Sequence, residues 1–225
     1  MARITVADNF LTVLNLFETE TQDGQDRLLE EMRSIIDSAN YEGWISSTLL
    51  GGVDQRGTAN YIQWRSLEDL QQRYATETFR HETVPLFNEL STSIRLLKTE
   101  VVFTRQRSTV QEIEISPAGN EHTVIIVMGV DPDRQKEVVE LFAQHDEWLE
   151  TVPGYVSNSI LRGIDGTDVV NFAQWESKET YDAFHSLPEE DRPNEVREVR
   201  ARIRELLTAR SANSYRVVHT RSAED

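Results

Sequence analysis

Two segments of the sequence pair an amide with an indole at the same spacing. Asn60 and Trp64 lie in the segment Asn-Tyr-Ile-Gln-Trp, and Asn171 and Trp175 lie in Asn-Phe-Ala-Gln-Trp. If each segment is a β-strand, alternate side chains point to one face, so the amide and the indole share a surface. Both groups can hydrogen-bond a developing negative charge without titrating, which suits the stabilisation of an oxyanion. An indole packed in the core and an amide that ends a hairpin are the structural alternative.

A third amide, Asn15, lies in a short apolar segment that is rich in β-branched residues. In a strand it would share a face with Leu11, Val13 and Phe17. A buried amide without a partner costs roughly 1 to 3 kcal/mol, so this position calls for a partner or a ligand.

These motifs belong to an internal repeat with a constant offset of 111 residues. Gly43-Trp44-Ile45-Ser46 matches Gly154-Tyr155-Val156-Ser157 at this offset. The same offset carries Gly52-Val53-Asp54 onto Gly163-Ile164-Asp165. Chance matches would not keep one register, so the chain consists of two copies of one module.

Each copy alternates element types in the order βαββαβ. Short β-branched runs predict strands, apolar residues at helical spacing predict helices, and a glycine ends the first helix before a hairpin. This order is a ferredoxin-like unit, so the fold class is α+β. In copy one we expect a first strand at 12–17, a first helix around 28–39, a second helical stretch around 67–97 and a last strand at 100–104. In copy two the corresponding ranges are 123–130, around 138–149, around 178–208, and 215–220.

The repeat predicts two domains, residues 1–105 and 121–225, joined by a linker at residues 106–120. The linker finds no partner in the repeat alignment and ends in Ser-Pro-Ala-Gly-Asn. Residues 110–115 alternate apolar and polar side chains, which fits either an edge strand or an extended crossing segment.

The composition excludes several classes of protein. Asp and Glu number 39 against 23 Lys and Arg, a formal net charge of −16, which argues against nucleic acid as a partner. Cysteine is absent, which excludes disulfides, thiolate metal sites and a cysteine nucleophile. No signal-like or membrane-spanning apolar run is present, so we expect a cytoplasmic protein without a membrane partner. The five histidines stand apart and no phosphate-binding loop occurs, so neither a metal nor a nucleotide site is predicted.

At these residues the module resembles the antibiotic biosynthesis monooxygenase family, whose members share the dimeric α+β barrel fold. The resemblance rests on Asn15, on the Gly-aromatic-aliphatic-Ser start of the second strand, on the hairpin Asp, and on the Asn-aromatic-aliphatic-Gln-Trp third strand followed by Ser. It implies that two ferredoxin-like units pair their sheets into one barrel, each unit keeping a pocket between sheet and helices. With both units in one chain, we expect an intramolecular pseudo-dimer, present as a monomer or as a further homodimer.

The resemblance also implies a chemistry. Cofactor-independent members that oxidise aromatic polyketides combine a first-strand Asn with a third-strand Asn and Trp, a pattern that Asn15, Asn60 and Trp64 match as catalytic candidates. A small aromatic substrate such as a polycyclic phenol, anthrone or hydroquinone reduces dioxygen itself once deprotonated. Dioxygen would then be the co-substrate and no bound cofactor is expected, although a reduced flavin or quinol as a diffusible reductant remains open. The two amides would orient the phenolate, and the indole would contact the oxygenated centre.

Copy two departs from this pattern, because Ile126 occupies the position of Asn15. Its Tyr181 follows Trp175 by six residues, an offset at which some quinone-forming members have a tyrosine. Helix packing or a solvent-exposed position is the alternative for Tyr181, His81 and His185. The candidate substrate-binding residues are therefore Tyr74, His81, Asn171, Trp175, Tyr181 and His185.

Three other functions remain as alternatives. Haem-degrading members combine a first-strand Asn, a third-strand Trp and a helical His about ten residues later, but copy one has Tyr74 at the ligand position and copy two has Ile126 in place of Asn. A polyketide cyclase or isomerase would use the same pocket, and a non-catalytic ligand-binding accessory protein would keep the motif as a fold signature. An apolar cavity of roughly 300 Å³ or more beside the amides would favour a ring substrate, and a filled pocket the accessory role.

Overall fold

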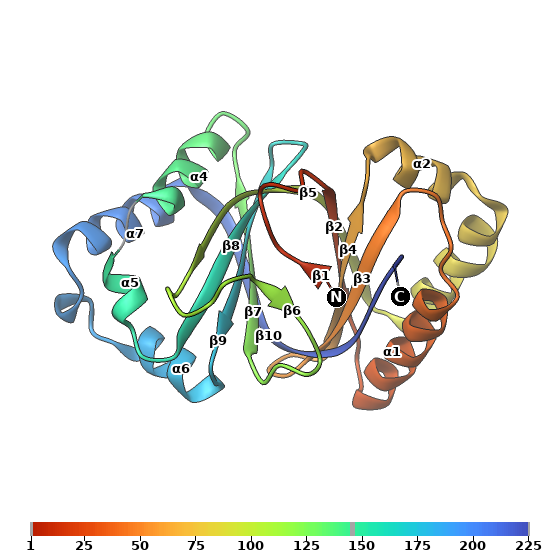
Figure 1. The fold of residues 1–225 in the computed structure, drawn as a ribbon, viewed down its shortest axis with the longest axis horizontal. Coiled ribbons are helices and arrows are strands. Elements are labelled where there is room, and N and C mark those ends of the chain that lie inside the picture. The colour runs from red at the N-terminus through yellow and green to blue at the C-terminus, as the bar shows by residue number, and fades with distance from the viewer. Residues whose placement is uncertain (1, 145–146, 225) are drawn as a thin grey trace.

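The computed structural model describes residues 2–144 and 147–224 and places the helices on two opposite sides of a central group of strands (Figure 1). Copy one contains β2 (Leu11–Glu18), α1 (Gln22–Asp37), β3 (Trp44–Gly52), β4 (Gly57–Trp64), α2 (Leu67–Ala75), the π-helix η1 (Phe79–Thr83), α3 (Val84–Leu90) and β5 (Ser93–Gln106). Copy two contains β7 (His122–Val130), α4 (Gln135–Ala143), α5 (Glu147–Thr151), β8 (Tyr155–Gly163), β9 (Asp168–Trp175), α6 (Lys178–Ser186), the 3-10 helix η2 (Glu189–Asp191), α7 (Asn194–Leu206) and β10 (Leu207–Ser222).

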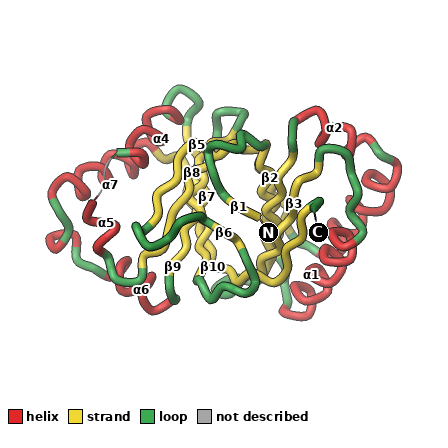
Figure 2. The backbone as a smooth tube through the Cα atoms, in the orientation of Figure 1, coloured by secondary structure: helices red, strands yellow, loops and turns green. Residues whose placement is uncertain are grey.

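Eight strands, four from each copy, form a closed barrel in the order β10-β3-β4-β2-β5-β8-β9-β7. Each copy keeps the strand order of a ferredoxin-like unit, and Figure 2 shows the strands enclosed between the two helix layers. Closing the sheet gives every strand of the barrel two neighbours, so no backbone edge is left unpaired. The predicted fold, two tandem ferredoxin-like units that share one intramolecular α+β barrel, is confirmed.

The last strand of each copy is longer than predicted because it pairs with both copies. β5 pairs with β2 over residues 93–100 and with β8 over residues 99–106. β10 likewise pairs first with β7 and then with β3. The prediction that residues 93–97 and 207–208 end a helical stretch was wrong. Their helix-compatible spacing is overridden by ladder partners that lie far away in the sequence.

The predicted helical ranges also divide more finely than expected. The stretch after β4 divides into α2, η1 and α3. α2 ends at Ala75, because the next residue, Thr76, has an extended backbone (φ −68°, ψ 146°). The first helix of copy two divides into α4 and α5.

A separate two-stranded sheet connects the N-terminal segment with the linker. β1 (Ala2–Arg3) pairs with β6 (Glu114–Ile115), and Figure 1 shows the two side by side at the middle of the barrel. Arg3 lies opposite Glu114, and the offset of 111 residues relates these two positions as well. Of the alternating segment 110–115, only β6 is therefore a strand, and it lies outside the barrel ladder.

The repeated glutamine of the third strand attaches this small sheet to the barrel. Gln63 Nε2 donates to the carbonyl of Arg3 (2.9 Å), and Gln174 Nε2 donates to the carbonyl of Glu114 (2.8 Å). Ile4 and Ile115 pack in one buried cluster with inward-facing residues of both copies, including Tyr61 and Phe172. The two copies therefore share a single central core. Among the described residues, one further buried cluster lies between the sheet and the helices of copy one, and two lie in copy two.

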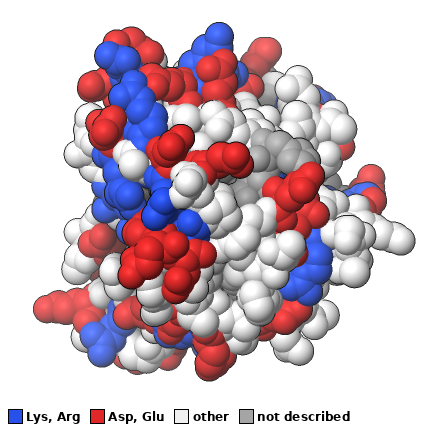
Figure 3. Space-filling view, turned by 90° about the vertical axis from the view of Figure 1, so that its left-hand side faces the viewer, with Lys and Arg blue, Asp and Glu red and all other residues white. Residues whose placement is uncertain are grey.

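Figure 3 looks onto the helices of copy two, where acidic and basic side chains lie next to one another over the surface. In the part of the chain that the structure describes, no helix is both long and apolar enough to cross a membrane.

We expect Gly154→Ala to lower the free energy of unfolding by about 1 to 3 kcal/mol from backbone strain alone. Gly154 directly precedes β8, the second strand of copy two, with φ 78°, and an added Cβ would lie 2.3 Å from Cβ of Thr180 on α6. Its carbonyl also accepts a hydrogen bond from the amide of Glu176 (2.8 Å). Urea unfolding measures the loss. Gly119→Ala is the matched control, because its added Cβ would meet only the flexible carboxylate of Glu121, and an equal loss there would contradict the interpretation.

Candidate functional site

A cavity of about 290 Å³ lies in copy one between the outer face of the sheet and the helices α1, α2, η1 and α3. Its walls are mostly apolar, with Phe17, Met32 and Ile36 among the side chains that line it. Leu96 and Asn88 also line it and are exposed, so the cavity opens to solvent where α3 is followed by β5. The volume is near the lower end of the range typical of small-molecule sites.

The three predicted catalytic residues all line this cavity. Asn60 and Trp64 share one face of β4 with Ile62, as the period of two predicted. Asn15 of β2 lies directly opposite Asn60 in the β2–β4 ladder. Two amides on neighbouring strands and one indole therefore face the same space.

The polar atoms of these residues lack partners within the protein. The Oδ1 atoms of Asn15 and Asn60 and the Nε1 atom of Trp64 are buried without a hydrogen-bond partner in the described part of the chain. Asn60 is 8% exposed and Trp64 is 3% exposed, so bulk water does not readily replace the missing partners. Each such group costs roughly 1 to 3 kcal/mol unless a ligand satisfies it. These three atoms are therefore free to hydrogen-bond a molecule that enters the cavity.

An aromatic wall extends from Trp64 along the cavity. Tyr41 stacks on Trp64 with ring centroids 6.4 Å apart and an interplanar angle of 23°. The guanidinium of Arg73 lies 4.1 Å from the centroid of Tyr41 and 5.1 Å from that of Phe79. Phe79 in turn stacks on Tyr74 (4.6 Å, 20°). The predicted residue Tyr74 thus lines the same cavity, and burial raises the pKa of its phenol.

The sequence predictions missed three residues of this wall, Tyr41, Arg73 and Phe79. Arg73 follows Leu70 by three residues, so it lies on the face of α2 that is turned toward the core. That spacing was a usable signal for Arg73. Tyr41 and Phe79 come from a loop and a π-helix, where no periodic pattern marks a buried side chain.

His81 is not brought to the cavity. It lies on η1, its side chain is 72% exposed, and its Nε2 is 3.1 Å from Oε2 of Glu77. Among the described residues, no three His, Asp or Glu side chains are grouped as metal ligands.

The corresponding region of copy two is packed differently. Ile126 lies opposite Asn171 in the β7–β9 ladder, so the facing pair of amides is lost, although Asn171 Oδ1 is also buried without a partner among the described residues. The ring of Trp175 lies 5.8 Å from the ring of Tyr181 and 5.0 Å from that of Phe184. Trp175 thus contacts aromatic side chains of α6 and belongs to a buried cluster.

His185 is an exposed residue on α6, beside Tyr181. Its ring lies 4.1 Å from the ring of Tyr181, and its Nδ1 is 3.0 Å from the carbonyl of the same residue. The predicted residues Trp175, Tyr181 and His185 are therefore brought together as a chain of contacting rings.

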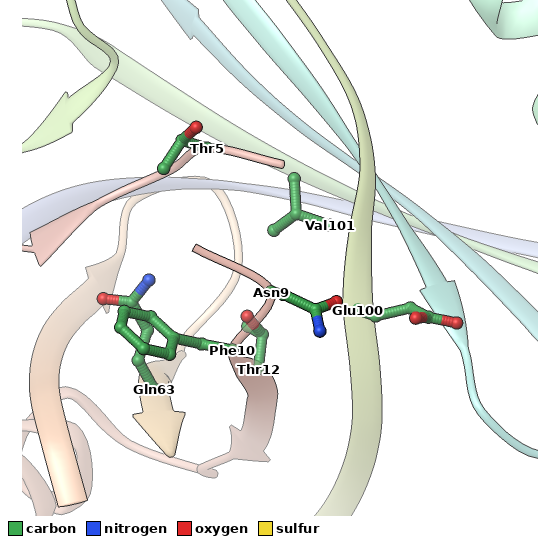
Figure 4. Close-up of a pocket in the computed structure, with 7 residues that line it drawn as sticks. All are labelled: Thr5, Asn9, Phe10, Thr12, Gln63, Glu100 and Val101. Carbon is green, nitrogen blue, oxygen red and sulfur yellow. The ribbon is translucent and has the colours of Figure 1, made fainter. Parts of the chain in front are cut away.

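A second hollow, shown in Figure 4, lies between the N-terminal segment, β2, β4 and β5 and is far smaller. Its volume is about 10 Å³, room for about one water molecule. Thr5, Asn9, Gln63 and Glu100 are among its lining residues. It is too small for an aromatic ring.

Known proteins match both the sequence and the structure. The family model described as antibiotic biosynthesis monooxygenase matches residues 122–191. Tetracenomycin-F1 monooxygenase of Streptomyces glaucescens is 36% identical over 75 residues, which are 33% of this chain and 67% of that protein. The crystal structure of an anthrone oxidase-like protein is 41% identical with a TM-score of 0.94, covering 100% of this chain and 98% of its own.

A more distant structure, a protein from Fusobacterium nucleatum, covers 96% of this chain and 95% of its own with a TM-score of 0.63. Its identity of 10% shows a common fold alone. The anthrone oxidase-like structure, in contrast, is similar in sequence over nearly its whole length. Together with the repeated Asn and Trp motif and the shared barrel, these matches show that the chain belongs to the antibiotic biosynthesis monooxygenase family.

Proposed function

We propose that the protein is a cofactor-independent oxygenase that acts on a polycyclic aromatic phenol, anthrone or hydroquinone in aromatic polyketide biosynthesis. The observation that carries this proposal is the apolar cavity of about 290 Å³ into which Asn15, Asn60 and Trp64 bring buried, unpartnered polar atoms. A ring substrate matches the apolar walls, its hydroxyl groups can donate to the two amide oxygens, and its oxygen atoms can accept from the indole N–H. The names of the related tetracenomycin-F1 monooxygenase and anthrone oxidase-like protein support this substrate class.

The proposed reaction needs the substrate as its anion. For an anthrone, the ionised ring transfers electrons to dioxygen, a carbon–oxygen bond forms at the methylene carbon, and the resulting peroxide breaks its O–O bond. One oxygen stays as the new carbonyl, and the other leaves as water with the two hydrogens of the methylene group. The protein has to hold the ring, stabilise the oxyanion and keep bulk water away.

The residues divide these tasks. The amides of Asn15 and Asn60, which face each other across two strands, hold the oxygen substituent of the ring. The indole N–H of Trp64 donates to the negative charge that develops on the oxygenated centre. We assign the reaction to copy one, since copy two has Ile126 in place of the first amide and packs Trp175 against rings of α6.

Oxygen consumption with a dihydroxyanthrone or a naphthohydroquinone, without added metal or flavin, tests this proposal. We expect the wild type to consume dioxygen, Trp64→Phe to lose about 10- to 100-fold in kcat, and Trp175→Phe to keep most of the activity. Phenylalanine keeps an aromatic ring at either position and removes the indole N–H. An absence of oxygen uptake by the wild type would refute the oxygenase assignment, and an effect confined to Trp175→Phe would place the reaction in copy two.

A further inference from the structure

The cavity holds no ordinary general base. None of the side chains that line it in the described part of the chain is Asp, Glu or His. Its ionisable side chains are Arg73, Tyr41 and Tyr74. A ligand that reacts as an anion therefore has to be stabilised as an anion by the site, since no lining carboxylate or imidazole can take up its proton.

Arg73 is a buried cation without a carboxylate counter-ion among the described residues. It is 8% exposed, and one of its nitrogens, Nη1, donates to Oγ1 of Thr76 (3.0 Å). It forms no ion pair with an Asp or Glu of the described residues, and the ionisable groups facing it are Tyr41 and Tyr74. Burial lowers the pKa of the guanidinium, but an arginine stays protonated even in such surroundings.

Arg65, a neighbouring arginine, differs from Arg73 because acidic side chains balance its charge. Arg65, between β4 and α2, is exposed and contacts both Asp69 (2.6 Å) and Glu42 (3.1 Å). Arg73, two turns further along, lies between the rings of Tyr41 and Phe79 instead. The rings hold the guanidinium in the cavity wall by cation–π contact without cancelling its charge.

We propose that Arg73 is the counter-ion of an aromatic oxyanion, so that the cavity selects ring ligands carrying an acidic oxygen group, a phenolic or enolic hydroxyl or a carboxylate. This inference rests on the proposed function, which supplies the aromatic ring of the ligand, and it adds that the ligand is bound as an anion. For a phenolic ligand, the O–H bond breaks, the electron pair stays on the oxygen beside Arg73, and the proton passes to bulk water through the mouth near Asn88 and Leu96. An opposite charge at close range lowers the pKa of an acidic group by about 1 to 3 units.

A ligand that changes colour on ionisation gives a direct test. 2-Hydroxyanthraquinone is titrated spectroscopically in solution and bound to the full-length protein. We expect the apparent pKa of the bound dye to fall by about 1 to 3 units in the wild type and to return toward the solution value in Arg73→Met. Arg80→Met, which removes an equal charge from an exposed position on η1, is the matched control and should keep the wild-type shift.

A second arm uses anthraquinone-2-carboxylate and its uncharged amide. Arg73→Met should weaken binding of the carboxylate about 10-fold or more and leave the affinity for the amide unchanged. If Arg73→Met changes only the affinity for the carboxylate, a carboxylate is the recognised group. If it changes only the pKa of the bound dye, a ring hydroxyl is the recognised group. An equal loss for carboxylate and amide would mean that Arg73 only shapes the wall, and it would overturn the inference.

The inference can be overturned even if Arg73→Met does not fold. A dye bound to the wild type with the same pKa as in solution would be enough to overturn it. The test is also separable from oxygen chemistry. A lowered pKa of the bound dye without any oxygen uptake supports the anion site and refutes the oxygenase assignment. Oxygen uptake without a change in that pKa refutes the anion site and leaves the oxygenase assignment in place.

Discussion

Asn60→Ala is expected to lower kcat for oxygen uptake by about 100-fold, and Asn15→Ala by a similar factor. The reason is that both amides line the same cavity from adjacent strands, with oxygens that no other group of the described chain satisfies. Removing one preorganised hydrogen-bonding group from a site of developing charge costs about 10²- to 10³-fold in kcat. Steady-state oxygen uptake measures the effect, and thermal unfolding shows that the variants remain folded.

The repeat supplies the control for this prediction. Asn171 occupies the position of Asn60 in copy two, but it faces Ile126 in its ladder. Asn171→Ala should therefore keep kcat within about twofold of the wild type. Full turnover by Asn15→Ala would remove that residue from the mechanism, and a large loss in Asn171→Ala would show that copy two also acts.

Phe172→Ala is expected to lower the free energy of unfolding by about 3 to 5 kcal/mol. The ring is 1% exposed, and its centroid lies 5.7 Å from that of Tyr61 with an edge-to-face angle of 64°. These two positions are related by the repeat offset and belong to the central core that both copies share. Because the barrel is closed through both copies, we expect one unfolding transition that shifts as a whole, measured by urea titration with fluorescence and circular dichroism.

Tyr61→Phe is the matched control for the shared core. The Tyr61 hydroxyl is buried without a hydrogen-bond partner among the described residues, and burial raises its pKa. Replacing it by the ring that copy two uses at this position should leave stability unchanged or raise it by about 1 kcal/mol. Two separate transitions in Phe172→Ala, with copy one unaffected, would contradict a common core.

Much of the candidate site follows from the sequence because it depends on local rules. The alternation of a strand places Asn60 and Trp64 on one face wherever the strand lies. The constant offset reveals two modules before any contact is known, and it marks Ile126 as the departure in copy two. Element types followed from short-range periodicity for the same reason.

The parts that the sequence did not reveal depend on distant partners. Residues 93–97 have an apolar spacing that also fits a helix, and they are a strand because β2 pairs with them. The pairing of β1 with β6 joins segments that are only two residues long, too short for a repeat to be recognised. Domain boundaries at 105 and 121 stay predictions.

The sequence by itself determined the duplicated ferredoxin-like module and the face that carries Asn60 and Trp64, since both arise from spacing along the chain. Only the tertiary structure decided that a cavity remains beside copy one's amides, and that Tyr41 and Phe79 enclose Arg73. The physical reason is that a cavity and an unpaired charge are properties of packing. They depend on which side chains of separate elements fill the space between sheet and helices, and a linear pattern does not record this.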